Sequence, residues 1–316
     1  MQPLSATANK SARCVATNLG VVPVSKTILF HCGSAKTGST TLQKELWAAQ
    51  TALRSAGFYY CPRFVRRGDV DPLNQAIRQL RSKQMLAKEL ERGVTMGRRR
   101  LQELFAMEGV HTVILSNESA LGDPFHDGRA GFFPLFDRSM EGLQRIFAGY
   151  TVKAFFTVRN QAELLPSFYT QRMRQGGSYS PQAYYDWGLS FDLSWVPVVR
   201  RLQAAFPELN LQRHEVLTRQ AVLAAATFRE HLPDSVLQSM MPIGKINSSA
   251  SVGALWVMRR FNALAQQPRM SAALRVRAPL FRFLERSVPG RKAALPANYQ
   301  AQLQQLYQQD LQALGC

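Results

Sequence analysis

The most regular feature of the chain is a set of short apolar runs separated by longer, periodic segments. The runs are rich in β-branched and aromatic residues, which is typical of buried strands. They predict five strands, at residues 27–32, 58–61, 113–115, 152–158 and 209–214. In segment 40–55 the apolar residues recur at helical spacing, which places Leu42, Leu46, Ala49 and Leu53 on one face. This pattern predicts a helix directly after the first strand and its turn.

The remaining periodic segments predict more helices. Two charged helices are expected at 73–92 and 96–107, separated by Gly93. Further helices are predicted at 138–148, 160–174, 181–187, 194–206, 218–231, 250–265, 271–287 and 297–313. Strands that alternate with helices indicate an α/β fold. We expect a P-loop-type parallel sheet flanked by helices on both faces, in a single domain with helical additions at its C-terminal end.

The domain boundaries follow from composition. Residues 1–25 are rich in Ser, Ala, Thr and Asn and carry only a weak apolar stretch, so we expect a disordered leader there and the α/β domain over 26–316. No apolar run reaches the roughly 20 residues that a membrane helix needs. The four cysteines show no repeated short spacing, which argues against a zinc pattern and a disulfide framework. A cytoplasmic location is the resulting expectation.

Basic residues dominate the charge of the chain. Lys and Arg number 39 against 21 Asp and Glu, which gives a formal net charge of +18. Such a field favours anionic partners. Between Arg259 and Lys292 there are nine basic residues and one acid, Glu285. This cluster is either a set of solvated helix faces or a docking surface for an acidic acceptor or an anionic membrane.

The turn after the first strand carries the most specific pattern. A strand that breaks at Gly33 and turns into a helix near Thr40 aligns unpaired N–H groups and the positive end of a helix dipole, which together favour phosphate. A Walker A loop places its lysine directly after the second glycine. Here Ser39 follows Gly38, and Lys36 lies two residues before that glycine. The turn is therefore not a standard nucleotide-triphosphatase loop.

Lys36-Thr-Gly-Ser-Thr-Thr41 resembles the 5′-phosphosulfate loop of sulfotransferases that use 3′-phosphoadenosine 5′-phosphosulfate, although the family's frequent proline before the lysine is Ala35 here. A second match follows strand 152–158, where Arg159, seven residues and Ser167 repeat the family's 3′-phosphate pattern. The guanidinium fork of an arginine suits a dianionic phosphate. The resemblance is to the bacterial, carbohydrate-sulfotransferase-like branch of the family.

The resemblance implies a role for each matched residue. Lys36 would offset the charge that grows on the leaving phosphate, while Arg159 and Ser167 would bind the 3′-phosphate. The 5′-phosphate would be held by backbone N–H groups and hydroxyls of Thr37, Gly38, Ser39, Thr40 and Thr41.

Weaker matches concern the rest of the nucleotide. Lys245 and Ser248 occupy the place of a loop that closes over the cofactor, although Ser248 could equally cap a helix. Trp47 and Phe168 could hold the adenine or belong to the core.

A general base must take the proton of the acceptor. Several carbohydrate sulfotransferases use a glutamate, and Glu118 lies in the Ser-Asn-Glu-Ser segment that follows strand 113–115. The alternative for Glu118 is a cap or an ion pair with an arginine. His126 in the following loop is the second choice, whereas His111 precedes the strand and should lie at its opposite end.

The expected activity is transfer of a sulfuryl group, without a metal, to a hydroxyl of a carbohydrate or glycolipid acceptor. Nucleic acid is not an expected partner. The sequence does not decide whether the chain contacts an anionic membrane peripherally, nor what its oligomeric state is. Two alternatives remain: a P-loop small-molecule kinase, and a basic polyanion-binding protein with a degenerate nucleotide site. The acceptor pocket is expected from loops 62–72, 119–135 and 176–192.

Overall fold

The computed structural model describes residues 26–63, 70–81, 86–126, 129–244, 250–267 and 276–316. The expected leader, residues 1–25, lies outside these ranges.

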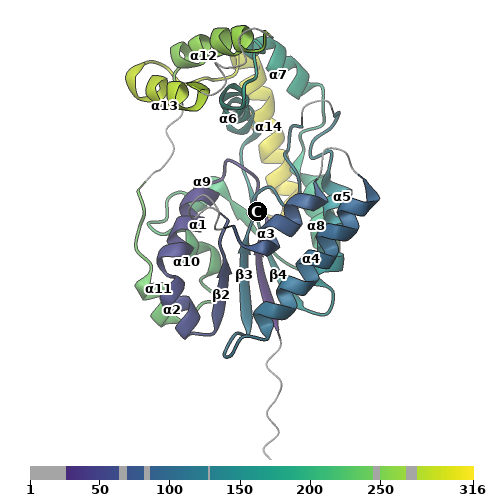
Figure 1. Cartoon of the computed structure of the whole chain (residues 1–316). Helices are drawn as coiled ribbons and strands as arrows, with labels where there is room; N and C mark the ends of the chain where they lie inside the picture. Colours follow the sequence, from purple (N-terminus) through teal and green to yellow (C-terminus); the bar gives the residue numbers. More distant parts are fainter. Residues whose placement is uncertain (1–25, 64–69, 82–85, 127–128, 245–249, 268–275) are drawn as a thin grey trace, which may run out of the picture.

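The described chain folds around one parallel sheet (Figure 1). Its strands are β1 (Thr27–His31), β2 (Phe58–Cys61), β3 (Thr112–Ser116), β4 (Thr151–Val158) and β5 (Glu208–Arg213), in the order β2-β3-β1-β4-β5. All neighbouring strands run parallel. The predicted α/β class is confirmed, and each strand lies within a residue or so of its predicted position.

The central strand β1 is buried along its apolar length. Ile28 pairs with Val113 of β3 and with Val152 of β4. The side chains of Ile28, Leu29 and Phe30 are at most 1% exposed. A strand buried on both faces needs a continuous apolar run rather than an alternating one, and this is the run that the sequence shows.

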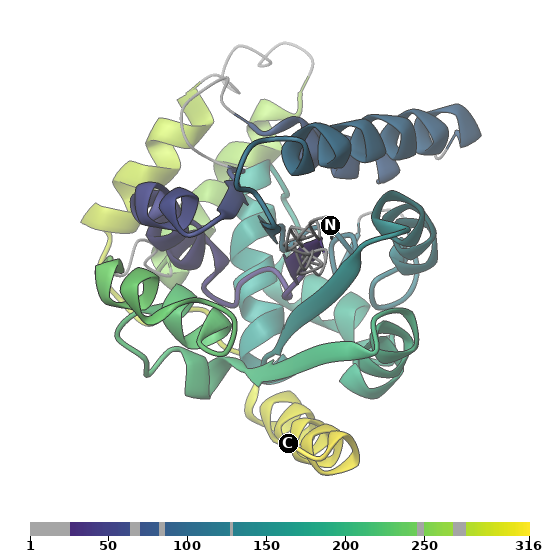
Figure 2. The same cartoon turned by 90° about the horizontal axis from the view of Figure 1, so that it is seen from below.

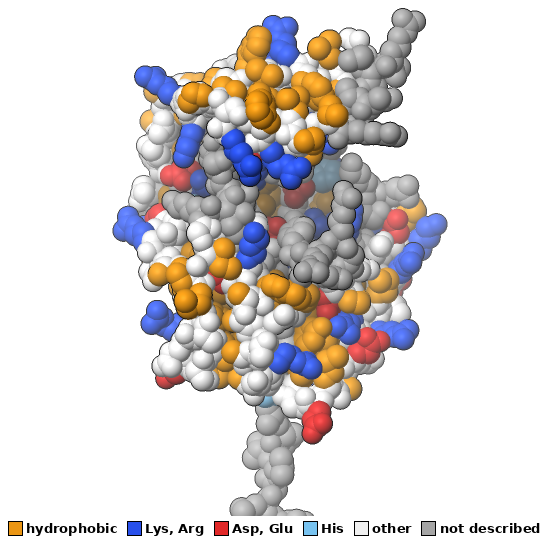
Figure 3. All heavy atoms as spheres, turned by 60° about the vertical axis from the view of Figure 1, so that its left-hand side comes forward, with side chains coloured by type: hydrophobic (Ala, Val, Ile, Leu, Met, Phe, Trp, Pro, Cys, Tyr) orange, Lys and Arg blue, Asp and Glu red, His pale blue; other side chains and the backbone are white. Residues whose placement is uncertain are grey.

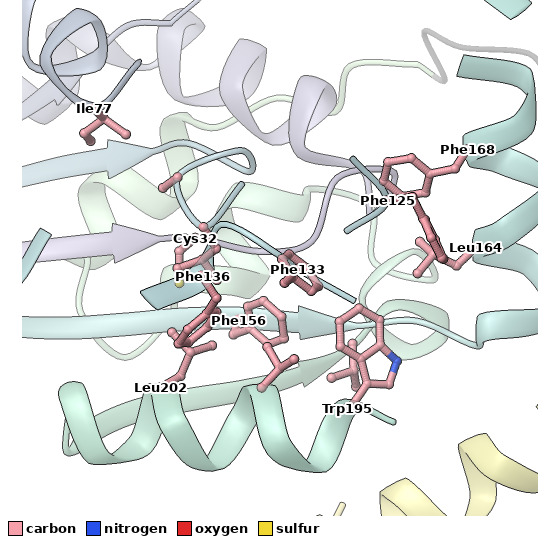
Figure 4. Close-up of a cluster of buried hydrophobic side chains, with 14 of the residues drawn as sticks. Cys32, Ile77, Phe125, Phe133, Phe136, Phe156, Leu164, Phe168, Trp195 and Leu202 are labelled. Atoms are coloured by element: carbon pink, nitrogen blue, oxygen red, sulfur yellow. The ribbon is translucent and has the colours of Figure 1, made fainter. Parts of the chain in front are cut away.

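Alternate side chains of β1 enter two separate hydrophobic clusters. Ile28 and Phe30 belong to the larger one, which also contains residues of helices α3, α4, α5 and α8. Figure 4 shows part of it, with Phe156 of β4 beside Leu202 and Trp195 of α8. Leu29 belongs to the smaller cluster, which is built with residues of α1, α2, α10 and α11.

The helices are mostly those predicted, with several different boundaries. Their bounds are α1 (Ser39–Ala48), α2 (Gln50–Ser55), α3 (Pro72–Leu80), α4 (Ala87–Phe105), α5 (Phe136–Phe147), α6 (Gln161–Gln175), α7 (Pro181–Leu189), α8 (Trp195–Ala205), α9 (His214–Leu217), α10 (Leu223–Phe228), α11 (Asp234–Ser239), α12 (Val252–Ala265), α13 (Arg277–Ser287) and α14 (Ala297–Leu314). The helix predicted over 40–55 is divided into α1 and α2 at Ala49.

The prediction that Gly93 separates two helices was wrong. α3 ends at Leu80, and α4 runs without interruption through Gly93. A Cβ atom at this position would lie 2.9 Å from the carbonyl oxygen of Ala76 and 3.0 Å from Cδ2 of Leu80. α3 and α4 therefore approach each other closely at Gly93. The glycine is needed for this packing and does not mark a turn.

The single helix predicted over 218–231 was also wrong. Within this range the helix is α10 alone; α9 ends at Leu217, before the range begins, and a turn separates the two. The buried carboxylate of Glu45, on α1, accepts a hydrogen bond of 2.7 Å from the backbone N–H of Ala224 in the first turn of α10. This long-range contact satisfies one of the N–H groups that a helix start leaves open, so it fixes where α10 begins.

The C-terminal helix α14 ties the end of the chain back to α6 and α8, and it is the yellow helix of Figure 2. Its buried Asp310 accepts hydrogen bonds from Gln161 Nε2 (2.7 Å), Ser194 Oγ (2.6 Å) and the backbone N–H of Trp195 (2.9 Å). One carboxylate therefore holds the first turns of α6 and α8 together. α12 and α13 pack against the C-terminal part of α6 and lie furthest from the sheet (Figure 1).

Candidate functional site

A cavity of about 1440 Å³ lies at the carboxyl ends of the strands. A residue at or shortly after the end of every strand lines it: Arg63 after β2, Glu118 after β3, Lys36 after β1, Arg159 after β4 and His214 after β5. This is the edge at which parallel α/β sheets collect their ligands. The basic residues that line the cavity, Lys36, Arg63, Arg81, Arg159, Arg172, Arg174 and Lys292, outnumber the acidic ones, Glu45, Glu118, Asp123 and Glu163. The cavity is suited to an anion.

The turn between β1 and α1 has an unusual backbone. Lys36 has a φ of 71° and Gly38 a φ of 93°. The left-handed region suits glycine but is strained for lysine, and such strain persists where the surrounding structure imposes it, often at functional sites. Thr37 is buried, and its hydroxyl donates to the carbonyl oxygen of Ser34 at 2.5 Å, which braces the turn from inside.

The first turn of α1 faces the cavity. The N-cap of α1 is Gly38, which has no side chain to cap the helix. Ser39, Thr40 and Thr41 follow and line the cavity together with Gly38, whereas Thr37 does not. The first N–H groups of a helix have no partner within it, so this end offers donors and a positive dipole to a ligand.

Lys36 is held in a partly buried position. Its Nζ donates to Oε1 of Gln171 on α6 at 2.8 Å. Burial, followed by the positive charges of Arg174 and Arg159, lowers the pKa of Lys36 to about 8. A lysine with this pKa is still largely charged at neutral pH, and among the described residues no carboxylate pairs with it as a counterion. An anionic ligand would supply one.

Arg159 reaches the same turn from β4. The strand continues past Phe155, the partner of the last β1 residue, to Val158, and Arg159 follows. Its Nη1 donates to the carbonyl oxygen of Lys36 at 2.6 Å, and its Nη2 lies 3.1 Å from Oε2 of Glu163. The carbonyl oxygen of Arg159 accepts from Nε1 of Trp195 at 2.9 Å. The backbone of Arg159 is therefore anchored to α8 while its guanidinium holds the Lys36 turn.

Ser167 and Phe168 lie on the part of α6 that faces the cavity. Asn160 caps α6 by accepting from the N–H of Ala162 at 2.9 Å, which sets the start of the helix just after Arg159. Ser167 is partly exposed and lines the cavity together with Arg159. Phe168 lines it too, although its ring is 4% exposed and packs edge-on against Phe125.

Glu118 enters the cavity wall with two partners. It forms an ion pair with Arg63 and accepts from Nε2 of Gln43 at 2.8 Å. The same amide nitrogen lies 3.2 Å from the carbonyl oxygen of Ser116, whose hydroxyl is 2.9 Å from Nδ1 of His31. Burial lowers the pKa of His31 to about 4, so its imidazole is neutral at physiological pH. The network fixes the position of the carboxylate.

The buried ring of His31 also explains why residue 33 is a glycine. A Cβ atom at Gly33 would lie 2.7 Å from Nε2 of His31, so a larger residue would displace the buried ring. The glycine that follows the predicted strand is therefore required by the buried imidazole beside it.

Other predicted residues lie away from the cavity or outside the description. Lys245 and Ser248 fall within 245–249 and lie outside the described residues. Trp47 packs against the smaller hydrophobic cluster and does not line the cavity. His111 precedes β3 and is bonded at the opposite edge, with Nε2 3.1 Å from the carbonyl oxygen of Ala56. His126 is not among the described residues that line the cavity.

Several lining residues had no distinctive pattern in the sequence. Gln171, Arg174 and His214 face the cavity, as does Arg63, which falls in loop 62–72, one of the loops expected to form the acceptor pocket. Burial and the charge of Arg159 lower the pKa of His214 to about 4. Gln171 lies four residues after Ser167 on α6, so helical spacing from Ser167 is the signal that could have found it.

Neither a membrane span nor a metal centre was found in the described parts of the chain. None of the described helices has the length and apolar content needed to cross a bilayer. Within the same ranges, no group of three His, Cys, Asp or Glu side chains is placed to hold a metal ion.

No protein-family model matches this chain, and a search of curated proteins found no match. The function is therefore inferred from the chemistry of the site.

Proposed function

We propose that this chain is a sulfotransferase that uses 3′-phosphoadenosine 5′-phosphosulfate as donor and a hydroxyl of a carbohydrate or glycolipid as acceptor. The proposal includes the finer description of the fold, a P-loop-type sheet covered by helices on both faces. The division of the β1 side chains between two hydrophobic clusters supports that description.

One observation carries the proposal. Lys36 and Arg159, the centres of two motifs far apart in the sequence, line one cavity, and Arg159 donates to the backbone of Lys36. The two motifs would bind opposite ends of one nucleotide, so both must face the same space. At about 1440 Å³ the cavity exceeds the 300–1,000 Å³ typical of a single small-molecule site. The excess leaves room for an acceptor beside the donor.

The donor set also fits the nucleotide. Arg159 lines the cavity, and its guanidinium offers positive charge to a ligand phosphate. The uncapped first turn of α1 offers further N–H groups. Lys36, Gly38, Ser39, Thr40 and Thr41 would hold the 5′ end, and Arg159 with Ser167 the 3′-phosphate.

The remaining residues supply charge and a proton acceptor. When bound, the donor supplies the sulfuryl group that is transferred. Lys36 places positive charge where a leaving phosphate needs it, and its Gln171 contact keeps the ammonium directed into the cavity. Glu118 would take the proton of the acceptor hydroxyl. Its oxygen atoms are already positioned by Arg63 and Gln43, which reduces the reorganisation that the step requires.

Two measurements test the function. Adenosine 3′,5′-bisphosphate should raise the melting temperature of the full chain, and ³⁵S-labelled donor should label a sugar or glycolipid acceptor. ATP with Mg²⁺ serves as the comparison. Stabilisation and phosphate transfer with ATP, without any effect of the bisphosphate, would identify a kinase instead. Binding of polyanions that survives loss of Lys36 and Arg159, with no transfer at all, would identify a polyanion-binding protein.

Arg159→Ala should weaken binding of adenosine 3′,5′-bisphosphate by about 2 kcal/mol, or roughly thirtyfold, because it removes a charge-assisted contact to the 3′-phosphate. Isothermal titration calorimetry measures the change. Adenosine 5′-phosphate, which lacks the 3′-phosphate, should lose much less affinity. Arg200→Ala, at an exposed position of α8, is the matched control. Equal losses for both nucleotides would show that Arg159 acts only by supporting the Lys36 turn.

Bisphosphate affinity should fall as the pH rises through about 8, the pKa of Lys36 in the free protein. Above that pH the amine is neutral in the free chain and attracts phosphate less. A bound phosphate raises the pKa of Lys36 again, so binding takes up protons in this range. The ligand's own phosphates titrate near pH 6 and contribute little there.

Calorimetry in two buffers of different ionisation enthalpy measures this proton uptake. Lys36→Ala should abolish it, whereas Lys44→Ala, at an exposed position of α1, should leave it unchanged. An affinity that stays constant between about pH 7 and about pH 9 would place Lys36 away from the bound phosphates.

A further inference from the structure

The two helices furthest from the sheet carry an exposed apolar face. On α12, Val252, Trp256 and Leu264 are 53%, 55% and 53% exposed. On α13, Phe283 is 63% exposed, and Val276 just before the helix is 52% exposed. Single exposed apolar residues need no explanation, but a group gathered on two contacting helices marks an interaction surface.

Arginines surround these apolar side chains. Arg260, Arg282 and Arg286 are exposed on the same two helices, and the guanidinium of Arg260 lies 5.4 Å from the ring centre of Trp256. Figure 3 shows the apolar side chains gathered over the upper part of the molecule, with basic side chains along their lower border.

Acidic side chains are missing from this face. α12 contains none, and the single acid of α13, Glu285, is turned inward into an ion pair with Arg174. The outward surface of α12 and α13 therefore combines exposed aromatic and aliphatic groups with arginines that no described carboxylate on these helices neutralises. This composition is typical of surfaces that insert apolar side chains between anionic lipid headgroups.

The same two helices contact segments that line the cavity. Arg174, the inward partner of Glu285, lines the cavity, and so do the residues from Lys292 to Leu295 that follow α13. Asn262 of α12 donates to the carbonyl oxygens of Met173 and Gly177 at the end of α6, the helix that presents Ser167. The apolar face and the cavity wall thus share their supporting helices, and Figure 3 shows a hollow next to the upper part.

We infer that the exposed face of α12 and α13 docks on an anionic lipid bilayer and holds the cavity at the membrane surface. The identity of the acceptor rests on the sulfotransferase function proposed above. With the cavity at the membrane surface, the acceptor is a hydroxyl of a lipid-borne headgroup. Trp256 and Phe283 enter the interface, and Arg260, Arg282 and Arg286 contact anionic headgroups. An aromatic ring with a nearby cation suits this depth, because one part is apolar and the other is wet.

Vesicle co-sedimentation of the full chain, without nucleotide, tests the docking. The chain should bind vesicles of phosphatidylcholine with phosphatidylserine and not vesicles of phosphatidylcholine alone. Trp256→Ala combined with Phe283→Ala should abolish binding, while Met241→Ala, at an exposed apolar position outside both helices, should have no effect.

A second pair of variants tests the charges. Arg282→Glu should weaken binding at least about tenfold, because it replaces an attraction to the anionic surface with a repulsion. Arg99→Glu makes the same change in net charge at an exposed position of α4, and it should leave binding within about twofold. Equal binding to both kinds of vesicle, or equal losses in the two variants, would overturn the proposal. So would a dimer in sedimentation that Trp256→Ala with Phe283→Ala dissociates, since the face would then bind a second copy.

The two proposals can fail separately. A chain that binds vesicles but not adenosine 3′,5′-bisphosphate would retain the docking surface and lose the sulfotransferase function. For a chain that does both, Trp256→Ala with Phe283→Ala should slow transfer to a glycolipid in vesicles and leave transfer to the free sugar unchanged. Equal slowing of both reactions would refute the lipid-borne acceptor.

Discussion

Lys36→Ala is expected to lower the turnover of sulfuryl transfer by at least about a thousandfold, because a preorganised positive charge at a leaving group is among the largest single contributions to catalysis. The chain should still fold, since the side chain faces the cavity and its one described hydrogen bond is to Gln171. Transfer from ³⁵S-labelled donor measures the activity, and circular dichroism measures the fold. Lys44→Ala, at an exposed position of the following helix α1, is the matched control.

Lys36→Gly separates function from backbone strain. Both variants lose the ammonium, but only glycine adopts a φ of 71° without strain. Urea unfolding should therefore give a free energy of unfolding about 1 kcal/mol higher for the glycine variant than for the alanine variant, with both inactive. Appreciable activity in either variant would mean that another cation stabilises the leaving group, and Arg174 would be the next residue to substitute.

Glu118→Gln is expected to lower turnover by about 10²- to 10⁴-fold and to leave bisphosphate affinity within about twofold. The amide keeps the shape of the side chain but accepts a proton far less readily. Turnover is measured with saturating donor and acceptor, and affinity by calorimetry. Full turnover in this variant would move the base elsewhere. Because His126 does not line the cavity, His214, which does, would be tested next.

The ion pair with Arg63 requires its own control, because loss of Glu118 also removes a partner of that arginine. Arg63→Met breaks the pair and retains the carboxylate. If Glu118 acts as the base, this variant should keep much more activity than Glu118→Gln. Equal losses in the two variants would show that Glu118 matters only as the partner of Arg63. Glu230→Gln, at an exposed position outside the cavity wall, is the matched carboxylate control.

Local patterns were sufficient for the sheet. β1 to β4 were visible as short apolar runs because strands buried within a parallel sheet leave a direct mark in composition. The edge strand β5 has no buried residue and shows only Leu209 and Leu211 alternating with polar residues. The turn at Lys36 and the position of Arg159 were visible for the same reason, since both directly follow such runs.

Helix boundaries were less predictable where a distant partner sets them. Gly93 carries the usual signal of a helix end, yet it allows α3 to approach α4, and the sequence near it does not show which helix will pack there. The start of α10 depends on the carboxylate of Glu45, which lies on α1. A contact over such a separation leaves no periodic trace at either residue.

The amino-acid sequence by itself determined the strands, the turn that carries Lys36 after β1 and the position of Arg159 after β4, because each depends on neighbours in the chain. Only the tertiary structure decided that Arg159 holds the backbone of Lys36, that Gln171 orients its ammonium, and that Glu118 is paired with Arg63. It also turned Glu285 inward and left the apolar face of α12 and α13 uncovered. Those outcomes depend on strand order and helix packing, which bring side chains together without regard to their distance in sequence.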